Sequence, residues 1–174
     1  MSELDEAWEL ALAEAEQRAR AAGRREIADY VALRKRNDLL RRAAIDWLVT
    51  TITSMAAEAN RTGAGIQIEQ DDAHRFNVGA ATMVGRRVTL RNGVRALTVE
   101  TGWPRTPRDG FVRGGGLACA NLKHFGRPRA NAQLMLLRSP GDAPQWIVIE
   151  KSGARSPLTE AQIRVHFSML LTEY

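Results

Sequence analysis

The stretch Arg61-Thr62-Gly63-Ala64-Gly65 divides the sequence into two parts of different composition. Residues 1–62 contain one glycine and no proline, whereas the following 112 residues contain thirteen glycines and all six prolines. Glycine and proline are the strongest local breakers of regular structure. We therefore expect long helices before this stretch and a frequently turning chain after it.

Before the break, apolar side chains recur at intervals of three and four residues, which places them on one face of a helix. The series begins with Leu4 and Trp8 and continues beyond the single glycine of this part, Gly23. Arginines on both sides of Gly23 are typical of a helix C-terminus. The pattern predicts two helices, over residues 3–22 and 25–60.

The combined length of these helices raises a question about Gly23. A straight helix over residues 3–60 would be about 87 Å long, whereas a compact chain of this size has a radius of gyration of about 16 Å. Either Gly23 bends the chain into a hairpin, or the first helix projects and packs on another subunit. Because the apolar phase hardly changes across Gly23, the sequence favours a projecting helix and hence an oligomer.

After the break, apolar and polar side chains alternate, which is typical of half-buried antiparallel strands. The alternation starts at Ile66 and resumes at His74, so we interpret the acidic run Glu69–His74 as a turn between two strands. Further strands are expected near residues 116–125, 131–138 and 145–151. A final helix is predicted over 157–172.

The sequence Asn92-Gly93 lies between two alternating segments and predicts a hairpin with a type I′ turn. That register pairs Leu90 with Arg95. It leaves Arg87 and Arg91 on the solvent side of the sheet. Four apolar side chains then point to the core: Val88, Leu90, Leu97 and Val99.

Together these elements predict a single α+β domain over residues 1–174. A helical segment (1–60) precedes an antiparallel sheet of about six or seven strands (65–151), and one C-terminal helix (157–172) follows. The chain is long enough to bury a core without disulfides or metals.

Composition and segment properties favour a cytoplasmic protein. No apolar run exceeds four residues, so no segment is expected to cross a bilayer. The acidic start of the chain differs from a secretory signal, and the single cysteine, Cys119, excludes an internal disulfide. The 22 arginines against three lysines, with abundant alanine and glycine, are typical of a GC-rich bacterial genome.

Charge is unevenly distributed along the chain. Residues 1–60 carry a net charge of −2, residues 61–138 carry +8, and residues 139–174 carry −1. A field of positive sign attracts anions, including nucleic acid and acidic proteins. The sheet region is therefore expected to meet an anionic partner.

The segment 101–116 is the strongest candidate for a binding site. It is long for a connection between neighbouring strands, and it combines arginines with aromatic residues, which suits phosphate contact and base stacking. Its three consecutive glycines would let backbone N–H groups approach an anion, but it matches no phosphate-loop fingerprint. The predicted binding residues are Arg87, Arg91, Trp103, Arg105, Arg108, Arg113, Arg127 and Arg129.

No pattern in the sequence identifies a catalytic or metal site. Glu69, Asp71, Asp72 and His74 offer oxygen and nitrogen ligands within six residues, but no distant partner motif supports a metal. Cys119 and His124 would lie on opposite faces of one strand, so His124 is not expected to activate the thiol. We predict a small buried cysteine, and no cofactor.

Three functional hypotheses follow from these observations. The leading one is a small binding or interaction protein without catalysis, whose basic sheet and loop surface meets nucleic acid or an acidic protein. The second is a ligand-binding protein or enzyme with a pocket between sheet and helices that uses Cys119, His74 or Asp72. The third is an assembly component that forms a homo-oligomer through its N-terminal helix.

Overall fold

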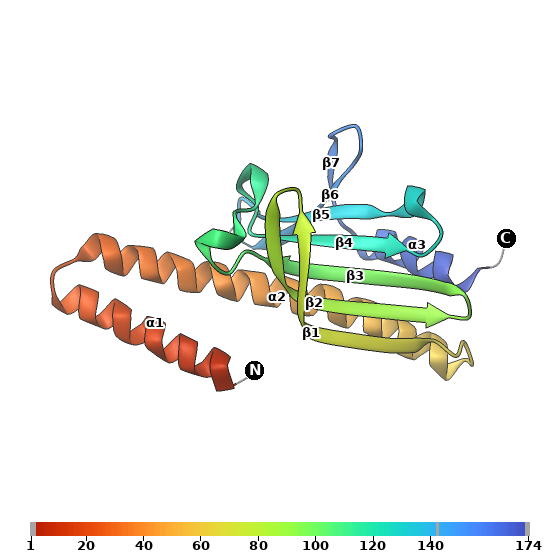
Figure 1. The fold of residues 1–174 in the computed structure, drawn as a ribbon, viewed down its shortest axis with the longest axis horizontal. Coiled ribbons are helices and arrows are strands. Elements are labelled where there is room, and N and C mark those ends of the chain that lie inside the picture. The colour runs from red at the N-terminus through yellow and green to blue at the C-terminus, as the bar shows by residue number, and fades with distance from the viewer. Residues whose placement is uncertain (1–2, 142, 173–174) are drawn as a thin grey trace. The chain divides into compact units, whose positions relative to one another are not determined.

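Within residues 3–141 and 143–172, which the computed structural model describes, three helices accompany a seven-stranded antiparallel sheet (Figure 1). The predicted α+β class is therefore confirmed. The described residues group into two compact units, and the division falls within the second helix, between Arg42 and Ala43. Among the described helices, none combines the length and the apolarity that a membrane span requires.

The first unit is a hairpin of α1 (Glu3–Ala21) and the first part of α2 (Arg25–Arg61). Gly23 has a φ of +70°, and the N–H of Arg24 donates to the carbonyl of Ala19, which is how a glycine-capped helix ends. Arg42 of α2 forms an ion pair with Glu9 of α1. The chain therefore reverses at Gly23, and the expectation that favoured a projecting first helix over a hairpin is wrong.

The junction between helix and sheet lies where the composition changes. Helix α2 ends at Arg61, and the N–H of Ala64 donates to the carbonyl of Ala59. The Asn60 side chain then holds the chain on both sides of Ile66, because it accepts from the Ile66 N–H and donates to the Ile66 carbonyl. The break predicted around Gly63 is thus confirmed.

The sheet is a simple meander in which each strand pairs with the next one along the chain. The predicted strands near 116–125, 131–138 and 145–151 and the C-terminal helix are confirmed, whereas the short last strand was not predicted. The elements of this unit after α2 are β1 (Gln67–Val78), β2 (Ala81–Asn92), β3 (Arg95–Trp103), β4 (Ala118–His124), β5 (Ala132–Arg138), β6 (Pro144–Ile149), β7 (Arg155–Pro157) and α3 (Glu160–Leu171).

The β2–β3 hairpin has a different register from the predicted one. Asn92 pairs with Arg95 and Leu90 with Leu97, so Gly93 and Val94 form the two-residue turn. Gly93, with a φ of +60°, takes the first central position of this turn, which suits the primed turn types. The predicted pairing of Leu90 with Arg95 is therefore wrong by two residues. A shift of two keeps every side chain on its predicted face.

The acidic run Glu69–His74 is not a turn between two strands. It lies inside the single strand β1, where Asp71 pairs with Arg87 and His74 pairs with Gly85. Two residues of β1 therefore oppose one of β2, which defines a β-bulge. The predicted strand-to-strand turn is wrong, because Asp favours a local backbone hydrogen bond at a bulge as well as at a turn. Here Asp71 accepts from the N–H of Ala73.

The bulge also exchanges the two faces of β1. Before it, Ile68 lies on the side of the sheet that α3 and the second part of α2 cover (Figure 1). After it, Phe76 and Val78 lie on the other side, which we call the open face. The C-terminal part of β1 and the N-terminal part of β2, which pair with each other, cross the open face in Figure 1.

In the described part of the sheet unit, the buried side chains form one group on each face of the sheet. The larger lies between helices and sheet, and it contains the four apolar residues of the β2–β3 hairpin that were predicted to face the core. Its largest fully buried members include Leu48, Ile52, Leu90, Leu97, Leu122, Leu134, Leu136, Ile163 and Leu170. The smaller lies on the open face and consists of Phe76, Ala81, Met83 and Cys119, packed by Val78 and Val112.

Candidate functional site

A hollow of about 230 Å³ lies on the open face. The segment 111–113 of the long β3–β4 connection and the β1–β2 end form its sides, while β4, β5 and β6 form its floor. We call it the loop pocket. Its apolar lining consists of Val78, Met83, Phe111, Val112, Cys119, Ala120, Leu134, Met135 and Ile149, and the remaining lining residues are Gly79, Arg113, Asn121 and Gln133.

The connection that borders the loop pocket is held by one buried carboxylate. Asp109 accepts hydrogen bonds from the backbone N–H groups of Thr106 and Arg105 and from the Thr106 hydroxyl. It also forms a 3.1 Å ion pair with Arg75 of β1. The Thr106 N–H leads the interactions that lower the pKa of Asp109, which outweigh the opposing effect of burial. The loop is therefore fastened to the end of the β1–β2 hairpin.

A polar cluster centred on Glu100 lies beside the loop pocket on the same face. The Glu100 carboxylate is 2.9 Å from His74 Nε2 and 2.7 Å from Lys123 Nζ, and it accepts from Asn121 Nδ2 at 3.3 Å. Burial alone would raise the pKa of Glu100, but Lys123, His74 and Asn121 together lower it. Because Asn121 also lines the loop pocket, the cluster fixes one polar group of the pocket floor.

Cys119 lines the loop pocket but is a poor nucleophile. Burial raises the pKa of its thiol to about 11, so the reactive thiolate is scarce at neutral pH. The prediction that Cys119 is a buried cysteine is confirmed. His124 lies on the opposite side of β4, as predicted, and cannot reach the thiol.

His124 instead contacts α3. Its Nε2 is 2.9 Å from Nδ1 of His166, and the two rings stack with centroids 5.2 Å apart. Burial, together with the nearby charges of His166 and Arg127, lowers the pKa of His124 to about 4, and burial lowers the pKa of His166. Both imidazoles are therefore neutral at pH 7, and the pair fastens helix to sheet.

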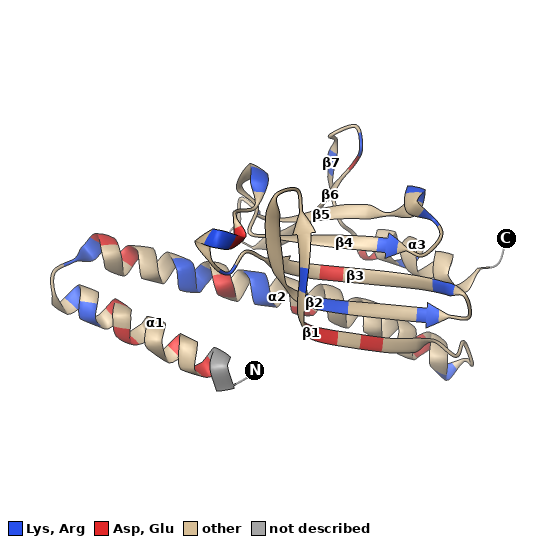
Figure 2. Ribbon diagram, viewed as in Figure 1, with Lys and Arg blue, Asp and Glu red and all other residues tan. Residues whose placement is uncertain are grey.

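The sequence-predicted binding residues do not form one surface. Arg87 and Arg91 lie on β2, where they face Asp71 and Glu69 of β1 at 3.7 and 3.6 Å. In Figure 2, acidic residues (red) lie on β1 and basic residues (blue) lie on the neighbouring strand β2. Their charges are therefore partly neutralised within the sheet.

The remaining predicted residues lie at two opposite ends of β4. Trp103 is buried, and the guanidinium of Arg105 stacks over it at 3.5 Å from the ring centroid. Arg108 and Arg113 are exposed in the same connection. At the other end of the strand, Arg127 donates to the carbonyl of Met169, and Arg129 is exposed. Of the eight predicted residues, Arg113 alone lines the loop pocket.

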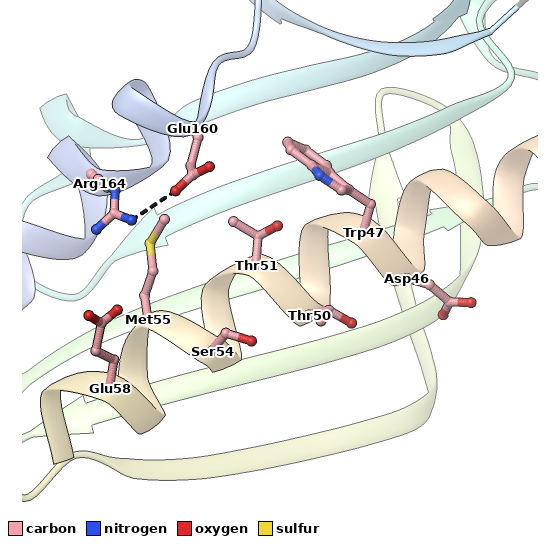
Figure 3. A pocket seen from close by; sticks show the side chains of 9 residues that line it. All are labelled: Asp46, Trp47, Thr50, Thr51, Ser54, Met55, Glu58, Glu160 and Arg164. Atoms are coloured by element: carbon pink, nitrogen blue, oxygen red, sulfur yellow. Dashed lines mark hydrogen bonds and ion pairs between the residues drawn. The ribbon is translucent and has the colours of Figure 1, made fainter. Parts of the chain in front are cut away.

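A second hollow lies on the outer side of the helices in the same unit. This groove of about 460 Å³ runs between α2 and α3, with Trp47, Thr51 and Met55 on one side and Glu160 and Arg164 on the other (Figure 3). Glu160 and Arg164 form an ion pair at 2.8 Å. The groove is wider than the loop pocket, and its charged lining residues are the acidic Asp46, Glu58 and Glu160 and the basic Arg164, so it suits a small anion less well than the loop pocket does.

Metal binding finds no support in the part of the chain that the structure describes. Asp72, one of the predicted candidates, forms an ion pair with Arg86, and His74 is held by Glu100. Among the described residues, no group of three or more His, Cys, Asp or Glu side chains could hold a metal ion.

The sequence pattern missed Glu100 and the location of the pocket. Glu100 follows Val99 in an alternating strand, so the pattern predicts that it is exposed to solvent, although it is buried. The hollow that Cys119 lines lies on the face opposite the helices, whereas the second hypothesis placed a pocket between sheet and helices. Neither feature had a local signal, because both depend on the β1–β2 hairpin crossing the sheet.

Comparison with known proteins adds no assignment. No family model matches the chain, and neither the curated proteins nor the solved structures include a significant match.

Proposed function

We propose that the protein binds a small anionic molecule with an apolar body, held in the loop pocket. The observation that carries this proposal is an apolar hollow on the open face whose lining includes one exposed arginine, Arg113. Its volume of about 230 Å³ lies just below the range of about 300–1,000 Å³ typical of ligand pockets. The expected ligand is therefore a short-chain carboxylate or phosphate, or the end of a longer one.

The charges near the pocket support an anion rather than a cation. A Cβ placed at Gly114 would lie 3.4 Å from Arg155 Nη2 and 3.6 Å from Met135 Cε, so a second guanidinium lies close to the pocket lining. The carboxylate of Glu100 is already engaged by Lys123 and His74. A ligand carboxylate would meet Arg113 and Arg155, whose planar groups suit bidentate contact.

The proposal also explains the exposed aromatic residue of the loop. Phe111 lines the pocket with 75% of its surface exposed. Exposed large apolar side chains at the edge of a hollow are typical of ligand-binding grooves. An apolar ligand body would cover part of this ring and so offset its exposure.

The experiment is a titration with sodium octanoate, followed by calorimetry and by NMR shifts of the pocket residues, with 1-octanol as the uncharged control. We expect saturable binding of octanoate and weaker binding of octanol. Arg113→Gln should weaken octanoate binding about tenfold, the loss of one charge-assisted hydrogen bond. Arg108→Gln is the matched control, because Arg108 is exposed in the same loop but does not line the pocket.

A second variant blocks the pocket without removing a charge. Gln133 is an exposed lining residue on β5, so Gln133→Trp should fill the hollow and abolish binding. Gln145→Trp places the same ring on an exposed position of β6 outside the lining and should leave binding unchanged. Octanoate that binds Gln133→Trp as well as the wild type would overturn the proposal. Salt-dependent binding of single-stranded DNA, lost with Arg105, Arg108 and Arg113, would favour the nucleic-acid hypothesis instead.

A further inference from the structure

We propose that the helical hairpin of residues 3–42 is a dimerisation module that pairs with the hairpin of a second copy of this chain. The outer faces of the two helical hairpins, one from each copy, would pack against each other around a two-fold axis and form a four-helix bundle. This inference is independent of the loop pocket, which lies in the other unit.

The hairpin has too small a core to be complete by itself. Its buried apolar side chains, among those that the structure describes, are Leu12, Ala19, Ala28 and Val31, and two of these are alanines. Units of about 40 residues usually need a disulfide, a metal or association with another chain. The single cysteine lies outside this unit, and among the described residues no group of side chains could hold a metal ion, so association with another chain would supply the missing burial.

The outer face of α2 carries exposed apolar side chains at regular spacing. On α2, Tyr30 and Leu33 are 64% and 48% exposed, and they belong to a stripe that continues through Asn37 to Leu40. On α1, Leu10 is 63% exposed. Alternating steps of three and four residues are the pattern of helices that pack against helices in bundles.

The charges of the two helices favour a second copy as the occupant. Residues 3–21 contain six acidic and two basic side chains, a net charge of −4, whereas residues 24–42 contain seven basic and three acidic ones, a net charge of +4. In a two-fold arrangement, α1 of each copy can lie on α2 of the other, so that both contacts join opposite charges. An isologous contact of this kind requires a self-complementary surface, which the hairpin provides.

The first test is the mass of the full chain in solution, measured by light scattering and sedimentation at micromolar concentration. We expect twice the 19.3 kDa of one chain. The double variant Tyr30→Glu/Leu33→Glu should weaken the dimer at least about a hundredfold, because it buries charge in an apolar contact. Val94→Glu is the matched control, since Val94 is 88% exposed in the β2–β3 turn and lies outside the helical hairpin of residues 3–42.

The second test separates loss of pairing from loss of folding. Glu14→Lys, on the outer face of α1, and Arg36→Glu, an exposed position on α2, should each weaken the homodimer several-fold. Mixing the two variants should restore pairing as a heterodimer, which a merely unfolded hairpin could not do. A monomeric wild type, a dimer that survives Tyr30→Glu/Leu33→Glu, or the absence of rescue on mixing would each overturn the proposal.

Discussion

The helix-covered face and the open face of the sheet are built from alternate residues of the same strands, but they are filled differently. The covered face is apolar across the middle strands, from Leu90 through Leu97 and Leu122 to Leu134. On the open face, the buried carboxylate of Glu100 lies next to the small apolar cluster around Met83. One face thus supplies most of the burial, whereas the other combines a polar cluster with a hollow.

The difference shows how one local irregularity changes the use of a sheet. The bulge in β1 moves Phe76 and Val78 to the open face, where they pack with Met83 and Cys119. If the same sequence formed a regular strand without the bulge, Phe76 and Val78 would lie on the covered face with Ile68. The loop pocket therefore depends on the bulge, because the bulge places the apolar side chains of the second half of β1 on the open face.

The largest effect should come from a cavity in the covered face. Leu122 is fully buried in the centre of the sheet, so Leu122→Ala should lower the free energy of unfolding by about 4 kcal/mol. Met83 is equally buried but belongs to the four-residue cluster on the open face, which can collapse around a smaller side chain. Met83→Ala should therefore cost about 2 kcal/mol. Urea unfolding measures both values, and equal costs would contradict the contrast between the faces.

The next effect concerns the carboxylate of the open face. Glu100→Gln removes the charge that binds Lys123 and His74, and it should cost about 2 kcal/mol at neutral pH, because the partly exposed Lys123 moderates the loss. Since the pKa of folded Glu100 lies below its ordinary value of 4.5, its ionisation contributes stability above that pH. This contribution disappears as the pH falls through the folded-state pKa.

The wild type and Glu100→Gln should therefore converge in stability below pH 4.5. Urea unfolding of both proteins over an acid series measures the convergence. Glu150→Gln is a suitable control, because Glu150 is exposed at the end of β6. A constant difference between wild type and Glu100→Gln at every pH would show that the charge of Glu100 is not involved.

A smaller effect of pH is expected on the covered face, at the His124–His166 pair. The pKa of folded His124 is about 4, below its ordinary value of 6.5, so the unfolded chain binds more protons between these values. The stability from the neutral pair is complete above pH 6.5 and is lost as the pH falls toward 4. Between about pH 7 and about pH 5 the wild type should lose between about 1 and 2 kcal/mol through this group.

The variant His124→Leu should show a smaller loss over the same pH interval, although it is less stable at pH 7 because it leaves His166 without its 2.9 Å partner. Thermal unfolding at several pH values measures this difference. An unchanged pH dependence in His124→Leu would exclude the pair as its source.

The parts of the fold that were predictable from sequence are those with a local cause. The helix boundaries, the break at Gly63 and the faces of Val88, Leu90, Leu97 and Val99 follow from periodicity and from glycine placement, and the structure confirms them. The reversal at Gly23, by contrast, depends on which residues α1 contacts after the turn. Apolar phase along the chain carries no information about that direction.

The candidate site was predictable only in part, because it is assembled by long-range contacts. The loop 101–116 was identified by its length and composition, and Arg113 within it lines the pocket. The Asp109–Arg75 ion pair that fastens the loop joins residues 34 positions apart. Glu100 of β3 and His74 of β1 meet across β2, and the sequence around either residue gives no sign of the other. Such pairs follow from the bulge and the crossing hairpin, which are tertiary features.

The smallest effect distinguishes the two registers of the β2–β3 hairpin. With Gly93 at the first central turn position and a φ of +60°, Gly93→Ala should cost about 1 kcal/mol, since an L-residue is strained there. Asn92 is a strand residue paired with Arg95, so Asn92→Ala should cost only a few tenths. In the Asn92-Gly93 turn that the sequence favoured, Asn92 would itself hold a positive φ, and its replacement would cost as much as that of Gly93. Urea unfolding of the two variants separates these cases, and comparable costs would favour the register of the sequence prediction. Neither outcome would move a side chain from the covered face to the open one, because the registers differ by two residues, whereas the single extra residue of the β1 bulge exchanges the faces.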